Sequence, residues 1–123
     1  PLGRAKIMGD LTKNFSRAEF ACKCGCGTNA INHMLVLFLQ KIRDHFDKPI
    51  KVVSGLRCAK RNAQVGGAKH SQHLLGNAAD IVIDGVKPKE VAAFAATLMP
   101  GWGGIKAYPR FTHIDVRSGV WRG

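Results

Sequence analysis

The sequence has no apolar stretch near the roughly 20 residues that a membrane-spanning helix requires, so we expect no insertion into a membrane. It also lacks internal repeats, low-complexity segments and linkers, and its 123 residues suit one domain rather than two. With one tyrosine and two tryptophans, no basic stripe is interleaved with aromatic rings as in a channel for single-stranded nucleic acid. These absences favour a single globular domain.

We also expect no secretory leader, because no charged-then-apolar segment precedes a small-residue cleavage site in this sequence. The first nine residues, PLGRAKIMG, are short, polar and glycine-rich, and they resemble the remnant of a purification tag or a disordered N-terminus. We therefore predict that residues 10–123 form the single folded domain.

Acidic residues are scarce. Eight Asp and Glu stand against 19 Lys and Arg, and the formal net charge is +11. Such a charge favours approach to an anionic polymer, whether nucleic acid, a membrane surface or a bacterial wall. The positive residues are spread along the chain without a basic block or a recognition-helix signature, so we expect no specific nucleic-acid binding. A basic surface that only aids solubility explains the charge equally well.

The four cysteines are Cys22, Cys24, Cys26 and Cys58. They could form a structural zinc site or disulfides, but the one-residue spacing is not the two-residue spacing usual in structural zinc sites. Neighbouring C-x-C pairs also close disulfides poorly, because alternate side chains of an extended chain point apart. A packed cysteine-glycine turn with reduced thiols is the third interpretation, and all three remain open.

Three segments have the pattern of helices. Ser16 and Glu19 form a capping box that predicts a short helical turn before the cysteines. Asn29 is expected to cap an amphipathic helix over residues 30–46, and a second long helix is expected to follow Pro88. The apolar face of the first helix is predicted to consist of Ile31, Met34, Leu35, Phe38, Ile42 and Phe46. That of the second consists of Val91, Phe94, Ala95 and Leu98.

Four segments have the pattern of strands, and a turn or short helix over residues 58–67 follows the first of them. The predicted strands are IKVVSG, AADIVID, GWGGIKAY and RFTHIDVR, the last two joined by a turn at Pro109. Helices first, then strands with one helix between them, predict an α+β fold in which helices pack on a small, mainly antiparallel sheet.

Residues of metal-binding type gather on two of these strands. In AADIVID, alternation places Asp80 on the face opposite Ile81, and His73 can fold back toward Asp80 through Gly76. In FTHIDV the same alternation puts His113 and Asp115 on one face, about 7 Å apart along the strand. Each histidine alone is more simply a core or surface residue, and His33, His45 and His70 are given no role.

Together, His73, Asp80 and His113 suit a catalytic zinc ion, which takes three protein ligands and leaves a position open for water. Zinc lowers the pKa of such a water and polarises a substrate carbonyl, as amide hydrolysis requires. We therefore predict one catalytic Zn²⁺ at these three residues.

With SGLRC before it and FTHIDVR after it, the segment SQHLLGNAAD resembles the M15 family of zinc D-Ala-D-Ala metallopeptidases, which includes many phage endolysins. The resemblance runs from about Leu11 to Trp121. It implies a hedgehog-like, DD-peptidase-like α+β fold, zinc on the three residues above and hydrolysis of a peptide bond in bacterial peptidoglycan. It also implies that Arg57 binds substrate and steadies the developing oxyanion, for which a forked guanidinium is suited. A structural ion pair is the lesser alternative for Arg57.

One position departs from the family pattern. Several members carry an acidic general base three residues before the last histidine, where this chain has Arg110, which cannot accept a proton from water. Asp115 is the obvious substitute as general base, and an equally good interpretation is a carboxylate that only orients a ligand or Arg57. Asp84 is a weaker candidate. Ser71 could hydrogen-bond substrate or simply shape a turn.

The leading hypothesis is a zinc peptidase of the cell wall, either a D-Ala-D-Ala carboxypeptidase or endopeptidase or an L-Ala-D-Glu endopeptidase. As a phage lysin it would be a monomer that waits in the host cytoplasm or is carried on the virion, with peptidoglycan as its partner. The alternative is a non-catalytic zinc module that binds wall or another polyanion. A basic nucleic-acid binder, with steeply salt-dependent affinity, is the third reading.

Overall fold

A computed structural model describes residues 10–27 and 29–123, so the prediction for residues 1–9 lies outside the described residues. The strands are β1 (Ile50–Ser54), β2 (Ala78–Ile83), β3 (Gly103–Ala107), β4 (Thr112–Asp115) and β5 (Val120–Trp121). They form one sheet in the order β1-β2-β4-β3-β5, in which only the pairing of β3 with β5 is parallel. The predicted α+β class with a mainly antiparallel sheet is confirmed.

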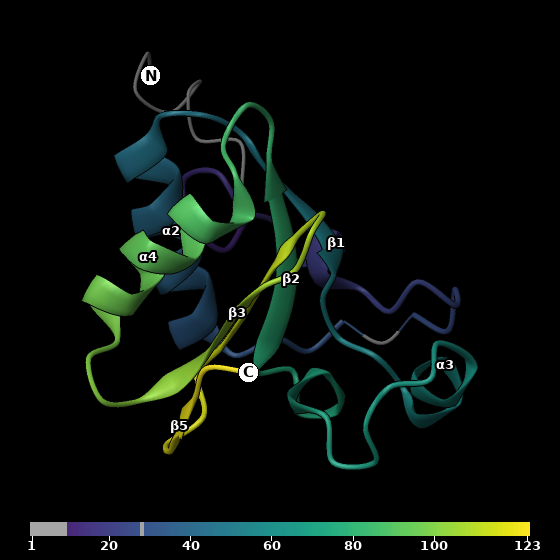
Figure 1. The fold of residues 1–123 in the computed structure, drawn as a ribbon. Coiled ribbons are helices and arrows are strands. Elements are labelled where there is room, and N and C mark those ends of the chain that lie inside the picture. Colours follow the sequence, from purple (N-terminus) through teal and green to yellow (C-terminus); the bar gives the residue numbers. More distant parts are fainter. Residues whose placement is uncertain (1–9, 28) are drawn as a thin grey trace, which may run out of the picture.

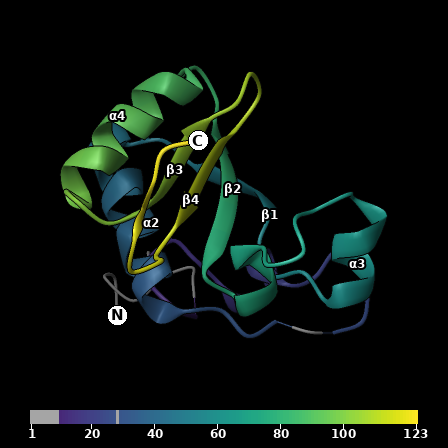
Figure 2. The same ribbon diagram turned by 60° about the horizontal axis from the view of Figure 1, so that its bottom comes forward.

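Two long helices cover one face of this sheet. They are α2 (His33–Phe46) and α4 (Pro88–Leu98), which lie side by side in both views (Figures 1 and 2). The shorter α3 (Ala59–Gln64) and the 3-10 turn η2 (Gln72–Leu75) belong to the segment that leaves β1 and returns to β2. Figure 2 shows this segment beyond one end of β1 and β2, away from the two long helices. None of the described helices is long and apolar enough to cross a membrane.

The core lies between the sheet and the two long helices. Alternation in β2 turns Ala79, Ile81 and Ile83 into this core, as predicted, and leaves Asp80 on the opposite face. The core also contains residues of the other strands and of both helices, among them Leu35, Leu39, Val91, Ala95, Ile105 and Ile114.

The first long helix differs from its prediction at its start and on its buried face. Asn32 caps α2, accepting a hydrogen bond from the Met34 amide at 2.9 Å, so the prediction of Asn29 as cap was wrong. Met34 is half exposed, against prediction. The fully buried positions are Leu35, Val36, Leu39 and Ile42. Ile31, Phe38 and Phe46 are partly buried against the core, so most of the predicted face is confirmed. The buried stripe also takes in Val36 and Leu39 because α2 meets both the sheet and α4, which favours a wider stripe than a single row of apolar positions.

Local signals were more reliable at the short elements. The turn η1 (Arg17–Phe20) begins with the predicted capping box, in which the Ser16 amide donates to Glu19 Oε2 at 2.6 Å. The short helix α3 and the predicted turn between β3 and β4 are also present. The two-residue strand β5 was not predicted, because a strand this short has no period of its own and exists through its pairing with β3.

Candidate metal centre

The pairing of β2 with β4 builds the centre of the site. In this antiparallel register Asp80 lies directly opposite His113, so their side chains project from the same face of the sheet. The turn η2 ends at Gly76, whose φ of 73° reverses the chain just before β2 begins. The predicted reversal at Gly76 is therefore confirmed, and it brings His73 back to Asp80.

The three donors converge on one point. His73 Nε2 lies 3.3 Å from Asp80 Oδ1, and His113 Nδ1 lies 3.0 Å from the same oxygen. All three donor atoms are within 4.8 Å of one another. Tetrahedral ligands with bonds to zinc of about 2.0–2.1 Å lie about 3.3 Å apart, so the donor set matches the size and chemistry of a zinc site.

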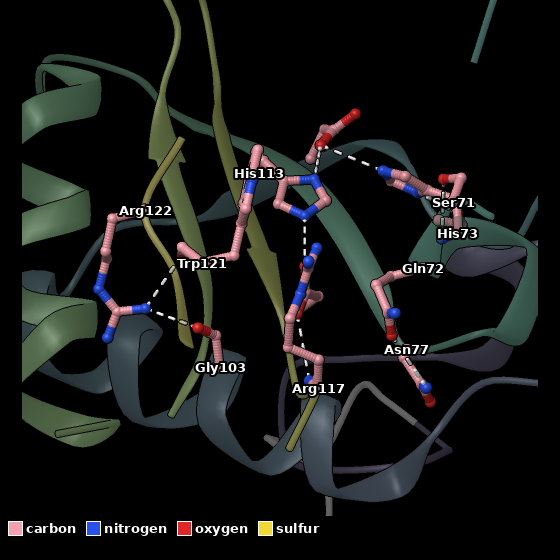
Figure 3. A network of polar contacts seen from close by, with 12 residues as sticks. Ser71, Gln72, His73, Asn77, Gly103, His113, Arg117, Trp121 and Arg122 are labelled. Carbon is pink, nitrogen blue, oxygen red and sulfur yellow. Dashed lines mark hydrogen bonds and ion pairs between the residues drawn. The ribbon is translucent and has the colours of Figure 1, made fainter. Parts of the chain in front are cut away.

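Each histidine is oriented through its other ring nitrogen. His73 Nδ1 donates to the carbonyl oxygen of Gly55 at 2.7 Å, and His113 Nε2 donates to Asp115 Oδ2 at 2.7 Å. Figure 3 shows the His113 ring between His73 on one side and Arg117 on the other. Such bonds fix the ring orientation and leave His73 Nε2 and His113 Nδ1 facing Asp80, where a metal would bind.

The carboxylate of Asp115 is enclosed. The residue has no exposed surface, and Arg117 donates to it from Nε at 2.8 Å, from Nη2 at 2.6 Å and from the backbone amide at 3.1 Å. The Trp121 ring packs against two of these residues. It lies 4.9 Å from the Arg117 guanidinium and 5.5 Å from the His113 ring. Both oxygens of Asp115 thus have partners, and its contact with the metal centre runs through His113.

The pKa values follow from these contacts. Burial works against ionisation of Asp80, yet hydrogen bonds from His113 and His73 hold its pKa at about 2. Burial opposes the charge of Asp115 too, but Arg117 and His113 hold its pKa well below the usual range. Burial lowers the pKa of His113, and contacts with Asp115 and Asp80 outweigh burial and raise it. Both carboxylates are therefore anionic at neutral pH.

Arg57 reaches the same point from the loop after β1. Its Nη2 lies 3.7 Å from Asp80 Oδ2, while Nη1 donates to Asn62 Oδ1 at 3.0 Å and Nε donates to Ser54 Oγ at 3.3 Å. Asn62 is itself buried and donates to the carbonyl of Ala68 at 2.9 Å. These bonds hold the guanidinium beside the three donors.

The donors line a cleft of about 570 Å³. Its other walls include three aromatic rings and several polar or cationic side chains, namely Tyr108, Phe111, Trp121, Arg57, His70, Ser71 and Arg117. Asp80 is the one carboxylate among the described residues that line it. Arg110 lies outside this lining, as does the exposed Asp84.

The structure brings together most of the predicted site. Arg57, His73, Asp80 and His113 meet at the cleft, and Ser71 borders it while accepting a hydrogen bond from the His73 amide at 3.2 Å. Ser71 therefore shapes the turn that presents His73.

Sequence reasoning missed four contributors: the Gly55 carbonyl, Arg117, Trp121 and His70. The alternation that paired His113 with Asp115 continues to Arg117 and could have found it. No local sequence pattern identifies the Gly55 carbonyl, Trp121 or His70 as part of the site.

The fold and donor set are those of an α+β domain that can hold a divalent metal ion beside a fixed guanidinium. The chain matches the family model Peptidase M15 over residues 13–115, and it belongs to this family of zinc-dependent metallopeptidases. No curated protein sequence matches the chain significantly.

Proposed function

We propose that the chain is a zinc peptidase that hydrolyses an amide bond in the stem or cross-link peptides of bacterial peptidoglycan. The observation that carries this proposal is the convergence of His73, Asp80 and His113 at zinc-ligand spacing, with Arg57 beside them in an open cleft. Membership of the M15 family supports the same chemistry.

His73 Nε2, Asp80 Oδ1 and His113 Nδ1 would hold the ion. Bound zinc supplies Lewis-acid chemistry, acidifying water and polarising a carbonyl. The hydrogen bonds to the Gly55 carbonyl and to Asp115 keep both imidazole rings in position before a ligand arrives. Site geometry that is set in advance costs no reorganisation during the reaction.

Arg57 would bind the substrate oxygen that gains charge. Its guanidinium is held by Asn62 and Ser54, so the remaining N–H groups can address a carboxylate or an oxyanion at the centre. Arg117 adds a second cation to the lining, while Asp80 is the one acid among the lining residues that the structure describes. We therefore propose a substrate with a carboxylate near the scissile bond, as the stem peptides of peptidoglycan have.

We assign Asp115 an orienting role rather than that of general base. A base must reach the proton that it takes, whereas both oxygens of Asp115 are bound by Arg117 and His113 and no part of the residue is exposed. Its charge would make His113 a stronger ligand.

The net charge of +11 would draw the protein to the anionic wall. On this proposal it acts as a monomeric lysin, from the host cytoplasm at lysis or from the virion. A non-catalytic zinc module that binds wall remains the second candidate, because the described cleft lining contains no carboxylate other than Asp80.

Mass spectrometry of purified peptidoglycan fragments tests the proposal. The fragments are incubated with the protein as purified, after chelation and after zinc is restored, with His113→Ala as the matched inactive variant. We expect a new fragment whose mass identifies the bond, lost on chelation and regained with zinc. No new fragment from several wall types, with zinc bound at the centre, would favour the binding module.

A further inference from the structure

A second cluster of metal-binding side chains lies outside the cleft. Cys22, Cys24 and Cys26 follow η1, and Cys58 lies at the start of α3, more than thirty positions later in the sequence. Nevertheless, the four sulfur atoms are all within 4.8 Å of one another. The segment after η1 runs toward α3 in Figure 1, which is how the distant cysteines meet.

The sulfur separations match one shared ion. Cys22 Sγ lies 3.5 Å from Cys24 Sγ and 3.7 Å from Cys58 Sγ, and Cys24 Sγ lies 3.6 Å from Cys58 Sγ. Four sulfurs around a zinc ion at about 2.3 Å stand about 3.8 Å apart. A disulfide needs about 2.05 Å between its sulfurs, so the separations of 3.5–3.7 Å among Cys22, Cys24 and Cys58 are not those of disulfides.

Backbone amides also favour negative charge on two of these sulfurs. The amide of Cys58 donates to Cys22 Sγ and that of Arg61 donates to Cys58 Sγ, both at 3.4 Å. Hydrogen bonds of this kind stabilise the thiolate form that a metal requires. Lys23, Lys60 and Arg61 lie within three residues of a cysteine in sequence, and their positive charges would offset part of the charge of four thiolates.

Two glycines explain how the one-residue spacing works. Gly25 and Gly27 have φ values of 84° and 83°, and the Gly25 amide donates to the Cys22 carbonyl at 3.4 Å. The chain therefore turns at these glycines instead of running extended, so successive cysteines no longer point apart. The one-residue spacing is therefore compatible with four sulfur atoms around one ion.

We propose that Cys22, Cys24, Cys26 and Cys58 bind a structural zinc ion, separate from the ion of the cleft. This ion ties the segment after η1 to the segment 55–58. Segment 55–58 is also held by the Leu56 amide, which donates to the Phe20 carbonyl at 2.8 Å. It carries both Arg57 and the Gly55 carbonyl that orients His73. The cysteine site thus positions groups of the cleft without touching substrate.

Metal content of four proteins tests the site directly. After gel filtration, zinc and iron are counted by mass spectrometry in the wild type, in Cys24→Ser, in His113→Ala and in the double variant. We expect two zinc ions per chain in the wild type, one in each single variant and none in the double variant. One zinc that His113→Ala loses and Cys24→Ser keeps would overturn the proposal, as would iron in place of the second zinc.

Cobalt gives an answer that does not depend on a cysteine variant folding. The His113→Ala protein, with all cysteines intact, is stripped of metal and loaded with Co²⁺. We expect intense thiolate-to-cobalt charge-transfer absorption in the near ultraviolet, which nitrogen and oxygen ligands do not produce. A spectrum without this absorption would overturn the cysteine site while leaving the proposed peptidase centre unaffected.

Hydrogen exchange tests the positioning role. The amides of Leu56 and Arg57 donate to the carbonyls of Phe20 and His73, so they report on the segment directly. We expect both to exchange faster in folded Cys24→Ser than in the wild type, whereas amides within α4 keep their rates. Unchanged exchange at Leu56 and Arg57 would overturn the positioning role.

Discussion

Nε2 of His113 lies 2.7 Å from Oδ2 of Asp115, a carboxylate with no exposed surface that Arg117 also binds through two guanidinium nitrogens. The opposite nitrogen of the ring faces Asp80. His113 is therefore held between two carboxylates, one at the proposed metal position and one behind it. The sequence left two roles open for Asp115, general base or orienting carboxylate, and this arrangement favours the orienting role.

Asp115→Asn should weaken both zinc binding and activity by about 10-fold to 100-fold, because His113 loses a charged acceptor. Zinc affinity is measured by competition with a chelating dye, and turnover by fragment release. Asp84→Asn, at an exposed aspartate just beyond β2, is the control and should change neither quantity. A general base would behave differently: Asp115→Asn would then keep full zinc affinity and lose turnover alone.

Gly104→Ala should damage the site from the neighbouring strand. Gly104 pairs with Asp115, and a Cβ there would clash with the Asp115 carboxylate, which must then shift from the position in which it accepts from His113. We expect a loss of about 1–3 kcal/mol in unfolding free energy, measured in urea, together with weaker zinc binding. Gly119→Ala is the matched control, since nothing lies within 4 Å of its Cβ. Wild-type stability of Gly104→Ala would contradict the packing described here.

Arg57→Lys should lower kcat by about 100-fold to 1,000-fold while zinc remains bound, because lysine keeps the charge but cannot form the forked hydrogen bonds. The measurements are fragment release and zinc content. Arg43→Lys, on α2 and outside the cleft lining, is the control. Equal activity of Arg57→Lys and wild type would remove the guanidinium from the proposed chemistry.

The zinc-free protein should lose stability in acid. The pKa of Asp80 is about 2 in the folded protein against an ordinary value of 3.8, so its contribution is fully present above 3.8 and is lost as the pH falls toward 2. Asp115 acts in the same direction. By linkage, a shift of this size at Asp80 corresponds to about 2 kcal/mol.

Urea unfolding of the zinc-free protein between about pH 5 and pH 2 measures this loss, with Asp80→Asn as the comparison. The variant should show a flatter dependence on pH because it lacks the titrating carboxyl group. A wild-type stability that stays constant over this range would contradict the contacts of Asp80 with the two histidines.

Much of the metal centre could be predicted because its signals are local. Period-two alternation placed Asp80, His113 and Asp115 on their strand faces, and Gly76 marked the reversal that returns His73. The N-terminal cap and the buried face of α2 were harder to predict from the sequence. Asn29 and Asn32 are both good helix caps, and the structure uses Asn32. The buried face of α2 is set by its packing against α4 and the sheet.

The sequence by itself determined which atoms are available: two imidazoles and a carboxylate on short segments, four thiols beside flexible glycines, and a strand period that sets the face of each side chain. Tertiary structure decided which ring nitrogen points inward, why Asp115 is enclosed, and how Cys58 meets the other cysteines. The physical reason is the distance along the chain over which each interaction acts. Alternation and capping act over a few residues. The enclosure of Asp115 depends on Gly104 of β3, and the sulfur cluster depends on Cys58, which a distant segment brings to the other cysteines.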